Sequence, residues 1–165
     1  MINNKIKKYL FPIHSLTNID IDNYFKDIEL KEALITKPKD MLNRHPMHRL
    51  LKDECVVINL DDADGGGTHW TLLCNSSNED SVLYYDSYGV KYIPQEIEDY
   101  LRTSNKPIDV NDGQHQFLGS ILCGYYCLKV AKSIFIDGMS YKEAIDLFSD
   151  NPSMNNRDLA DNLML

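Results

Sequence analysis

Two cysteines, Cys123 and Cys127, stand four residues apart in the stretch QHQFLGSILCGYYC at residues 114–127. A cysteine attacks carbonyl groups as the thiolate, and a helix N-terminus beside an imidazole lowers the pKa of the thiol. Apolar residues dominate from residue 119 or 120 to residue 135, which predicts a buried helix. Because Cys123 lies near its start and Cys127 one turn further in, we expect a reactive Cys123 and an inert, core-packed Cys127. We also expect Gly124 to leave the backbone beside the thiol open to a substrate.

Among the five histidines, His69 has the best position for a general base. It stands where the glycine-rich turn DADGGGT, residues 62–68, enters the predicted strand HWTLLC, and such a rigid edge holds a side chain still. Its neighbour Trp70 could pack over the site and keep water away. A strand-start histidine without a catalytic task is an equally weighted alternative. The other histidines occupy loops or termini, and we predict no catalytic role for them: His14, His45, His48 and His115.

Asp86 is the candidate for a carboxylate that orients the imidazole. It follows the apolar run VLYY, which would place a charge at the end of a strand paired with HWTLLC. The alternative is an aspartate that begins a turn before SYG, a common use of this residue. Three acidic residues nearer to His69 lie in or beside the glycine-rich turn and are weaker candidates: Asp61, Asp62 and Asp64.

A site for acyl transfer also needs a second donor for the oxyanion, beside the backbone N–H of the nucleophile. A glutamine amide can supply it, and both Gln114 and Gln116 precede Cys123. Each of these signals is weak alone. Their order along the chain, His–Asp–Gln–Cys, favours nucleophilic catalysis.

Other kinds of site fit the sequence poorly. Zinc sites favour paired ligands such as C-x2-C, whereas Cys123 and Cys127 form C-x3-C without a second pair. His45 and His48 lie in a proline-containing loop, where surface histidines are common. The GGG at residues 65–67 lacks the following lysine and helix of a phosphate-binding loop. We therefore expect no metal and no cofactor.

The hydrophobic pattern predicts an α+β fold. In it a small mixed or antiparallel sheet packs on a central buried helix that carries Cys123 at its N-terminus. Strands are expected over 54–62, 69–74, 81–87 and within 104–116; helices are expected over 16–25, 94–102, 119–135 and 140–150, with a loop over 36–49.

Length and charge set further bounds. The 165 residues suit one domain, 1–165, and 43% apolar residues are ordinary for a globular protein. A net charge of −8 argues against a general nucleic-acid binder, although KIKK at residues 5–8 is a small basic candidate. We find neither a membrane-spanning run nor a signal peptide, so the four cysteines predict free thiols in a reducing compartment.

The segments GTHW, YYDSYG and Q-x6-CG together resemble the adenovirus maturation protease (adenain) family and, more distantly, the Ulp1-type SUMO proteases. The resemblance covers about residues 54–136, roughly half the chain. It implies that His69 is the base, Asp86 the orienting acid, Gln116 the oxyanion donor and Cys123 the nucleophile. Because Gln116 precedes Cys123 by seven residues, the spacing favours the adenain side. Asp86 departs from it, since adenovirus enzymes often carry glutamate there.

The same resemblance implies an endopeptidase of a DNA virus, virophage or related mobile element. Its substrates would be capsid or core precursors, cut after a small residue such as glycine, in the host cell interior or the virion. An activating peptide could join as an added strand or through Cys55 or Cys74, whereas the acidic charge disfavours activation by DNA. We expect a monomer. Two alternatives are a deubiquitinase or deSUMOylase acting on host modifiers, and a non-catalytic scaffold.

Overall fold

The computed structural model describes residues 14–30, 32–36, 49–61 and 64–161. Its strands and helices come largely in runs and not in regular alternation, which is typical of an α+β fold. In chain order they are α1 Asn18–Asp27, β1 Ala33–Thr36, β2 Glu54–Asn59, β3 Trp70–Asn75, β4 Val82–Tyr85, α3 Gln95–Arg102, β5 Ile108–Val110, α4 Cys123–Phe135, α5 Tyr141–Ile145 and α6 Pro152–Asp161.

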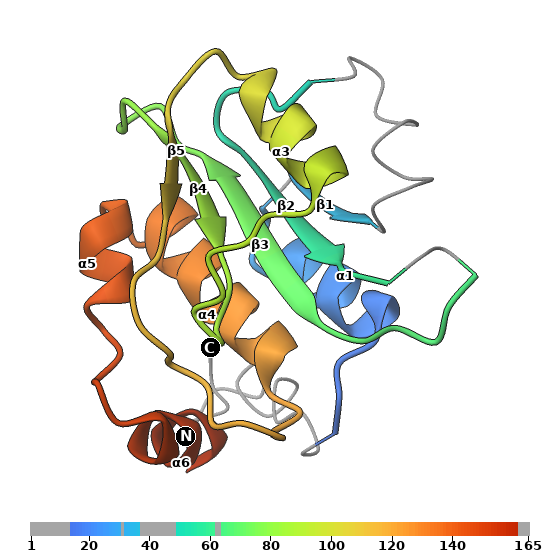
Figure 1. The fold of residues 1–165 in the computed structure, drawn as a ribbon, viewed down its shortest axis with the longest axis vertical. Coiled ribbons are helices and arrows are strands. Elements are labelled where there is room, and N and C mark those ends of the chain that lie inside the picture. The colour runs from blue at the N-terminus through green and yellow to red at the C-terminus, as the bar shows by residue number, and fades with distance from the viewer. Residues whose placement is uncertain (1–13, 31, 37–48, 62–63, 162–165) are drawn as a thin grey trace.

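The strands form one five-stranded mixed sheet in the order β1-β2-β3-β4-β5 (Figure 1). The three central strands β2, β3 and β4 are antiparallel neighbours, and the edge strands β1 and β5 pair in parallel with β2 and β4. The predicted strands at 54–62, 69–74 and 81–87 are therefore confirmed, and β5 lies within the extended segment 104–116.

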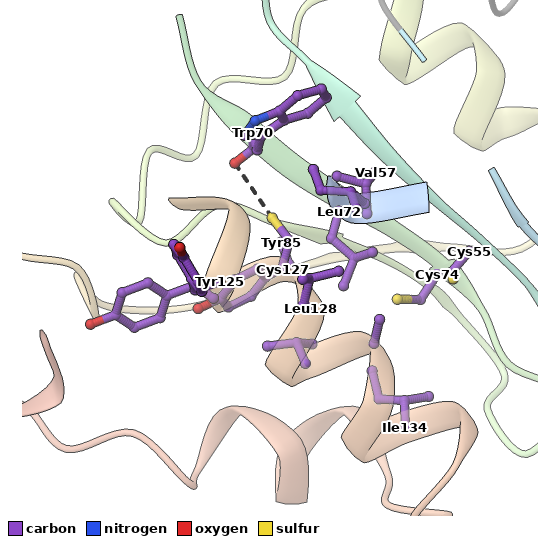
Figure 2. Packing of buried hydrophobic residues seen from close by; sticks show 14 of the residues in the cluster. Cys55, Val57, Trp70, Leu72, Cys74, Tyr85, Tyr125, Cys127, Leu128 and Ile134 are labelled. Atoms are coloured by element: carbon purple, nitrogen blue, oxygen red, sulfur yellow. Dashed lines mark hydrogen bonds between the residues drawn. The ribbon is translucent and has the colours of Figure 1, made fainter. Parts of the chain in front are cut away.

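Both faces of the sheet are covered, which explains why its central strands are apolar almost throughout. Successive side chains of a strand point to opposite faces. Alternate residues of β2, β3 and β4 thus pack against α1 and α4: Cys55, Val57, Leu72, Cys74, Leu83 and Tyr85. Figure 2 shows Cys55, Val57, Leu72, Cys74 and Tyr85 in this cluster with residues of α4. The intervening residues pack against α3 on the other face: Val56, Ile58, Leu73, Val82 and Tyr84 with Ile97, Tyr100 and Leu101.

The central helix α4 begins at Cys123, later than the predicted start at residue 119 or 120. Residues 117–120 form a turn instead, closed by the Ser120 N–H donating to the Phe117 carbonyl at 3.1 Å. Gly119 has a φ of +79°, which a right-handed helix cannot contain. This turn delays the helix, so that Cys123 falls in its first turn. The interior is buried as predicted from Gly124 to Ile134, apart from the partly exposed Lys129 and Lys132.

Capping residues set where α1 and α5 begin. Thr17 caps α1 and Ser140 caps α5, each in a capping box that Asp20 and Glu143 complete. α5 ends at Ile145, earlier than the predicted residue 150. β1 and α6 were not predicted from the sequence. Most of the predicted loop over 36–49, with His45 and His48, lies outside the described residues, as does KIKK. No helix in the described part of the chain is long and apolar enough to span a membrane.

Tyr141 attaches α5 to the end of the β3–β4 pair, and we predict that Tyr141→Phe destabilises the fold. Its buried hydroxyl accepts the Ser76 N–H at 2.9 Å and lies 3.1 Å from the carbonyl oxygens of Cys74 and Ser81. Removing it leaves a buried N–H without its acceptor, which costs about 1–3 kcal/mol. Urea unfolding measures the loss.

The matched control is Tyr92→Phe, at a tyrosine that is 75% exposed. We expect its free energy of unfolding to stay at the wild-type value. Equal stabilities of the two variants would show that the Tyr141 hydroxyl does not hold α5 in place.

Candidate active site

His69 and Asp86 meet at one end of the central strands β3 and β4. His69 directly precedes β3 and Asp86 directly follows β4, and in an antiparallel pair the start of one strand lies beside the end of the other. The imidazole Nε2 lies 2.8 Å from the Asp86 Oδ1, and the two side chains are only 12% and 3% exposed. A buried imidazole is thus held against a buried carboxylate.

Cys123 lies in the first turn of α4, close enough to His69 for each group to shift the pKa of the other. Burial alone lowers the pKa of His69, but hydrogen bonds to Asp86 and Cys123 and their negative charges outweigh burial and raise that pKa to about 9. Burial likewise raises the pKa of Cys123, yet hydrogen bonds from His69 and from the Trp70 and Gly124 backbone, with the imidazolium charge, lower it overall. The arrangement favours a thiolate–imidazolium pair.

The glycine-rich loop before β3 holds His69 at this end of the strand pair. The Asn59 Oδ1 accepts the backbone N–H groups of Asp61 and Thr68 at 3.0 and 3.1 Å, which ties the two ends of the loop together. Gly67 has a φ of +89° and donates its N–H to the Asp61 carboxylate at 2.8 Å. Asp61 therefore supports the loop, and the structure does not place it against the imidazole.

The turn after β4 fixes the Asp86 carboxylate. The amide of buried Asn111 clamps the Asp86 backbone from both sides, accepting its N–H and donating to its carbonyl at 2.9 Å each. The Tyr88 N–H donates to the same Oδ1 that faces His69, at 2.8 Å. Gly89 has a φ of +71°, and a Cβ there would lie 2.3 Å from the Gly113 carbonyl oxygen. Only glycine fits at this position without displacing the backbone.

Gln116 is fully buried and held in a defined orientation. Its Oε1 accepts the Ser87 hydroxyl at 2.5 Å, and the Ser87 carbonyl accepts the Gln116 N–H at 2.8 Å. Its Nε2 consequently faces the other way, within 2.8 and 2.9 Å of the Ser120 Oγ and carbonyl oxygen. Since Ser120 stands three residues before Cys123, the amide N–H groups point toward the segment that leads to the thiol.

Gln114 has a different environment. Its Nε2 donates to the Gln116 carbonyl at 2.8 Å, so its amide is used to hold the backbone of its neighbour. The structure thus brings His69, Asp86 and Cys123 together and places Gln116, not Gln114, with its amide toward the Cys123 segment. The catalytic roles of these residues stay a prediction.

Tyr88 is a site residue that the sequence analysis did not assign. Its ring stacks on the His69 imidazole, with centroids 4.8 Å apart and an interplanar angle of 29°. Its hydroxyl donates to the Ser120 carbonyl at 3.2 Å. Tyr88 therefore contacts the histidine on one side and the segment before Cys123 on the other. The sequence signal that could have identified Tyr88 is its position, two residues after Asp86.

Gly124 and Trp70 serve packing rather than access. Gly124 is buried, and a Cβ there would lie 3.1 Å from the Leu16 side chain and 3.3 Å from the Trp70 ring. The Trp70 indole N–H donates to the Leu16 carbonyl at 2.9 Å. The prediction that Gly124 leaves the backbone open to a substrate is therefore wrong: it lets the chain at Leu16 and the indole pack directly on the helix.

The other three cysteines are buried core residues. The Cys127 thiol donates to the Trp70 carbonyl at 3.5 Å, as Figure 2 shows, and this confirms its predicted packing role. Cys55 in β2 and Cys74 in β3 lie opposite each other in the sheet as free cysteines, and they are 1% and 0% exposed. Neither is accessible as an attachment point for an activating peptide in this fold.

Two further histidines lie within the described residues. His115 is not a surface residue: it is 6% exposed and packs between Tyr85 and Phe148. His14 lies 3.4 Å from the Asp20 carboxylate. Within the residues that the structure describes, no group of three or more histidine, cysteine or acidic side chains is arranged to hold a metal ion.

No family model and no curated protein sequence matches the chain. Solved structures do match. The pS273R protease of ASFV aligns over 94% of this chain and 70% of its own, with a TM-score of 0.60 and 18% identity. The SUMO protease Ulp1 aligns over 99% and 88%, with a TM-score of 0.54 and 16% identity. AvrA, solved with IP6 and CoA, aligns over 77% and 52% at a TM-score of 0.50 and 12% identity. The chain has the fold of the Ulp1-like cysteine proteases.

Proposed function

We propose that this protein is a cysteine protease whose nucleophile is Cys123. The observation that carries the proposal is the arrangement of Asp86, His69 and Cys123: the carboxylate lies 2.8 Å from the imidazole, and the imidazole and the thiol each shift the pKa of the other. The lowered pKa of Cys123 and the raised pKa of His69 favour the charged pair that thiol proteases use for attack. The shared fold with pS273R and Ulp1 supports the same assignment.

In the proposed reaction the Cys123 thiolate attacks the carbonyl carbon of a peptide bond. The His69 imidazolium gives its proton to the leaving amine, which departs and leaves a thioester on Cys123. Neutral His69 then takes a proton from water, the hydroxide attacks the thioester, and the thiolate returns as the acid product leaves. Asp86 holds the ring orientation and stabilises the imidazolium throughout.

The Cys123 backbone N–H and the Gln116 amide are the proposed donors for the oxyanion. α4 has no side-chain cap, so its first N–H groups are available to a bound group. The Gln116 Nε2 has two N–H bonds for three nearby acceptors: the Ser120 Oγ, the Ser120 carbonyl and, at 3.3 Å, the Tyr88 hydroxyl. A substrate carbonyl oxygen would replace one of them.

The proposed substrates are viral capsid or core precursor polypeptides, cut after small residues such as glycine. This assignment rests on the motif resemblance and on the likeness to a protease of ASFV. With this assignment we also propose that the enzyme acts in the host cell or the virion, that it is a monomer, and that an accessory peptide activates it.

A second candidate is an isopeptidase for ubiquitin-like modifiers. It is favoured by the likeness to the Ulp1 protease domain, which was solved in complex with the SUMO orthologue Smt3. Fluorogenic ubiquitin and SUMO substrates, run beside short glycine-containing peptides, separate the two. Faster cleavage of the peptides supports the precursor protease, and faster cleavage of a modifier supports the isopeptidase.

The test of the protease assignment is Cys123→Ala beside Cys127→Ala. We expect Cys123→Ala to abolish cleavage of a quenched-fluorescent peptide library while the free energy of unfolding changes little, because Cys123 is only partly buried. Cys127→Ala should keep activity and lose roughly 1–2 kcal/mol of stability, because it removes a buried sulfur. Cleavage that survives Cys123→Ala would contradict the assignment.

A second pair of variants tests the oxyanion donor. Gln116→Ala should lower kcat about 10²–10³-fold, as loss of one oxyanion donor does. Gln114→Ala should stay within about threefold of wild type, since its amide faces a backbone carbonyl.

Alkylation of Cys123 by iodoacetamide needs no oxyanion donor and controls for the integrity of the site. Alkylation should proceed at a similar rate in wild type and both glutamine variants. Equal kcat values for Gln116→Ala and Gln114→Ala, with alkylation retained, would rule out Gln116 in this role.

A further inference from the structure

The segment between Gln116 and Cys123 exposes three large apolar side chains. Phe117, Leu118 and Ile121 are 54%, 67% and 42% exposed. Single exposed apolar residues are ordinary on a protein surface, but three within five residues form a local patch. From Gly113 to Leu128 the chain also contains no aspartate, glutamate, lysine or arginine, although a quarter of all its residues are charged. We call Phe117, Leu118 and Ile121 the apolar patch.

The backbone beneath the apolar patch is fixed. The Phe117 N–H donates to the Asn156 Oδ1 at 3.1 Å, and that oxygen also accepts the Tyr126 hydroxyl at 2.7 Å. The Ser120 carbonyl accepts from both Gln116 and Tyr88. The segment thus uses its backbone groups inward and directs its apolar side chains outward.

Turn geometry does not account for these residue types. The turn over 117–120 needs its glycine, and Gly119 supplies the positive φ. Its first two positions usually hold polar residues or proline, whereas Phe117 and Leu118 occupy them here. An exposed apolar residue on a rigid loop is typical of a surface that binds a partner.

The position of the apolar patch identifies the partner. The segment starts at the proposed oxyanion donor and ends at the proposed nucleophile. It is the last part of the connection that, in Figure 1, runs from β5 past α6 to the start of α4. A polypeptide whose carbonyl reaches both Cys123 and Gln116 must pass beside it. We propose that the apolar patch binds apolar side chains of the substrate next to the scissile bond. This proposal rests on the proposed protease function.

The test uses quenched-fluorescent peptides that carry leucine or serine at each position within three residues of the cut. For wild type we expect kcat/KM to favour leucine over serine by at least about tenfold at one such position. In Leu118→Ser and Ile121→Ser we expect that ratio to fall to about threefold or less, chiefly through KM. The alkylation rate of Cys123 should stay at the wild-type value.

Ile136→Ser is the matched control. Ile136 is 45% exposed, close to the value for Ile121, but lies at the opposite end of α4, about 20 Å away for a helix of this length. Its leucine-to-serine ratio should equal that of wild type. An unchanged ratio in active Leu118→Ser and Ile121→Ser overturns the apolar patch as a substrate site and leaves the protease assignment intact.

Two other results would also overturn the inference. Size-exclusion chromatography could show a dimer that only the patch variants dissociate, with their cleavage ratio unchanged, and a second copy would then cover the apolar patch. Absence of any peptide cleavage by wild type, with Cys123 no more reactive than an ordinary thiol, would remove the protease function and with it this site.

Discussion

The contact of the His69 imidazole with Asp86 on one side and Cys123 on the other is the interaction on which the site depends. A buried histidine alone would be neutral, and a buried thiol alone would stay protonated, because burial disfavours both charged forms. The hydrogen bonds and opposite charges reverse both tendencies: Asp86 and Cys123 both raise the pKa of His69, and His69 together with the Trp70 and Gly124 backbone lowers that of Cys123. The fold must therefore hold three side chains from separate elements at hydrogen-bond distance.

The ends of the central strands β3 and β4 and the start of the central helix α4 together meet this requirement. β3 and β4 bring His69 and Asp86 together at one end of this strand pair. The delayed start of α4 puts Cys123 in the first turn of the helix beside them. The DSYG segment links the parts: Asp86 faces the imidazole, Ser87 orients Gln116, and Tyr88 stacks on His69. Four consecutive residues, with Gly89 allowing the turn, thus support both the proposed base and the proposed oxyanion donor.

The sequence predicted the central strands and the buried helix, and it named His69, Asp86, Gln116 and Cys123 as the candidate site without Tyr88. Strong apolar runs and capping residues such as Thr17 and Ser140 are local signals that the structure retains. β1 was missed because it is only four residues long, ALIT, and pairs in parallel with β2. Such pairing depends on residues that are distant in the sequence. Gly124 was misinterpreted because its contacts, Leu16 and Trp70, are remote in sequence. The contacts of Asn111 with the Asp86 backbone and of Tyr88 with His69 could likewise be recognised only in the folded structure.

The most direct measurement is an NMR titration of the His69 ring in wild type and in Cys123→Ala. The pair requires that the imidazolium persist until the pH rises through its raised pKa, so wild-type His69 should titrate at about 9. Cys123→Ala removes the sulfur hydrogen bond and charge while Asp86 remains, and the pKa of His69 should fall clearly below the wild-type value. A wild-type His69 that titrates near its ordinary value of 6.5, unchanged in Cys123→Ala, would contradict the coupled pair.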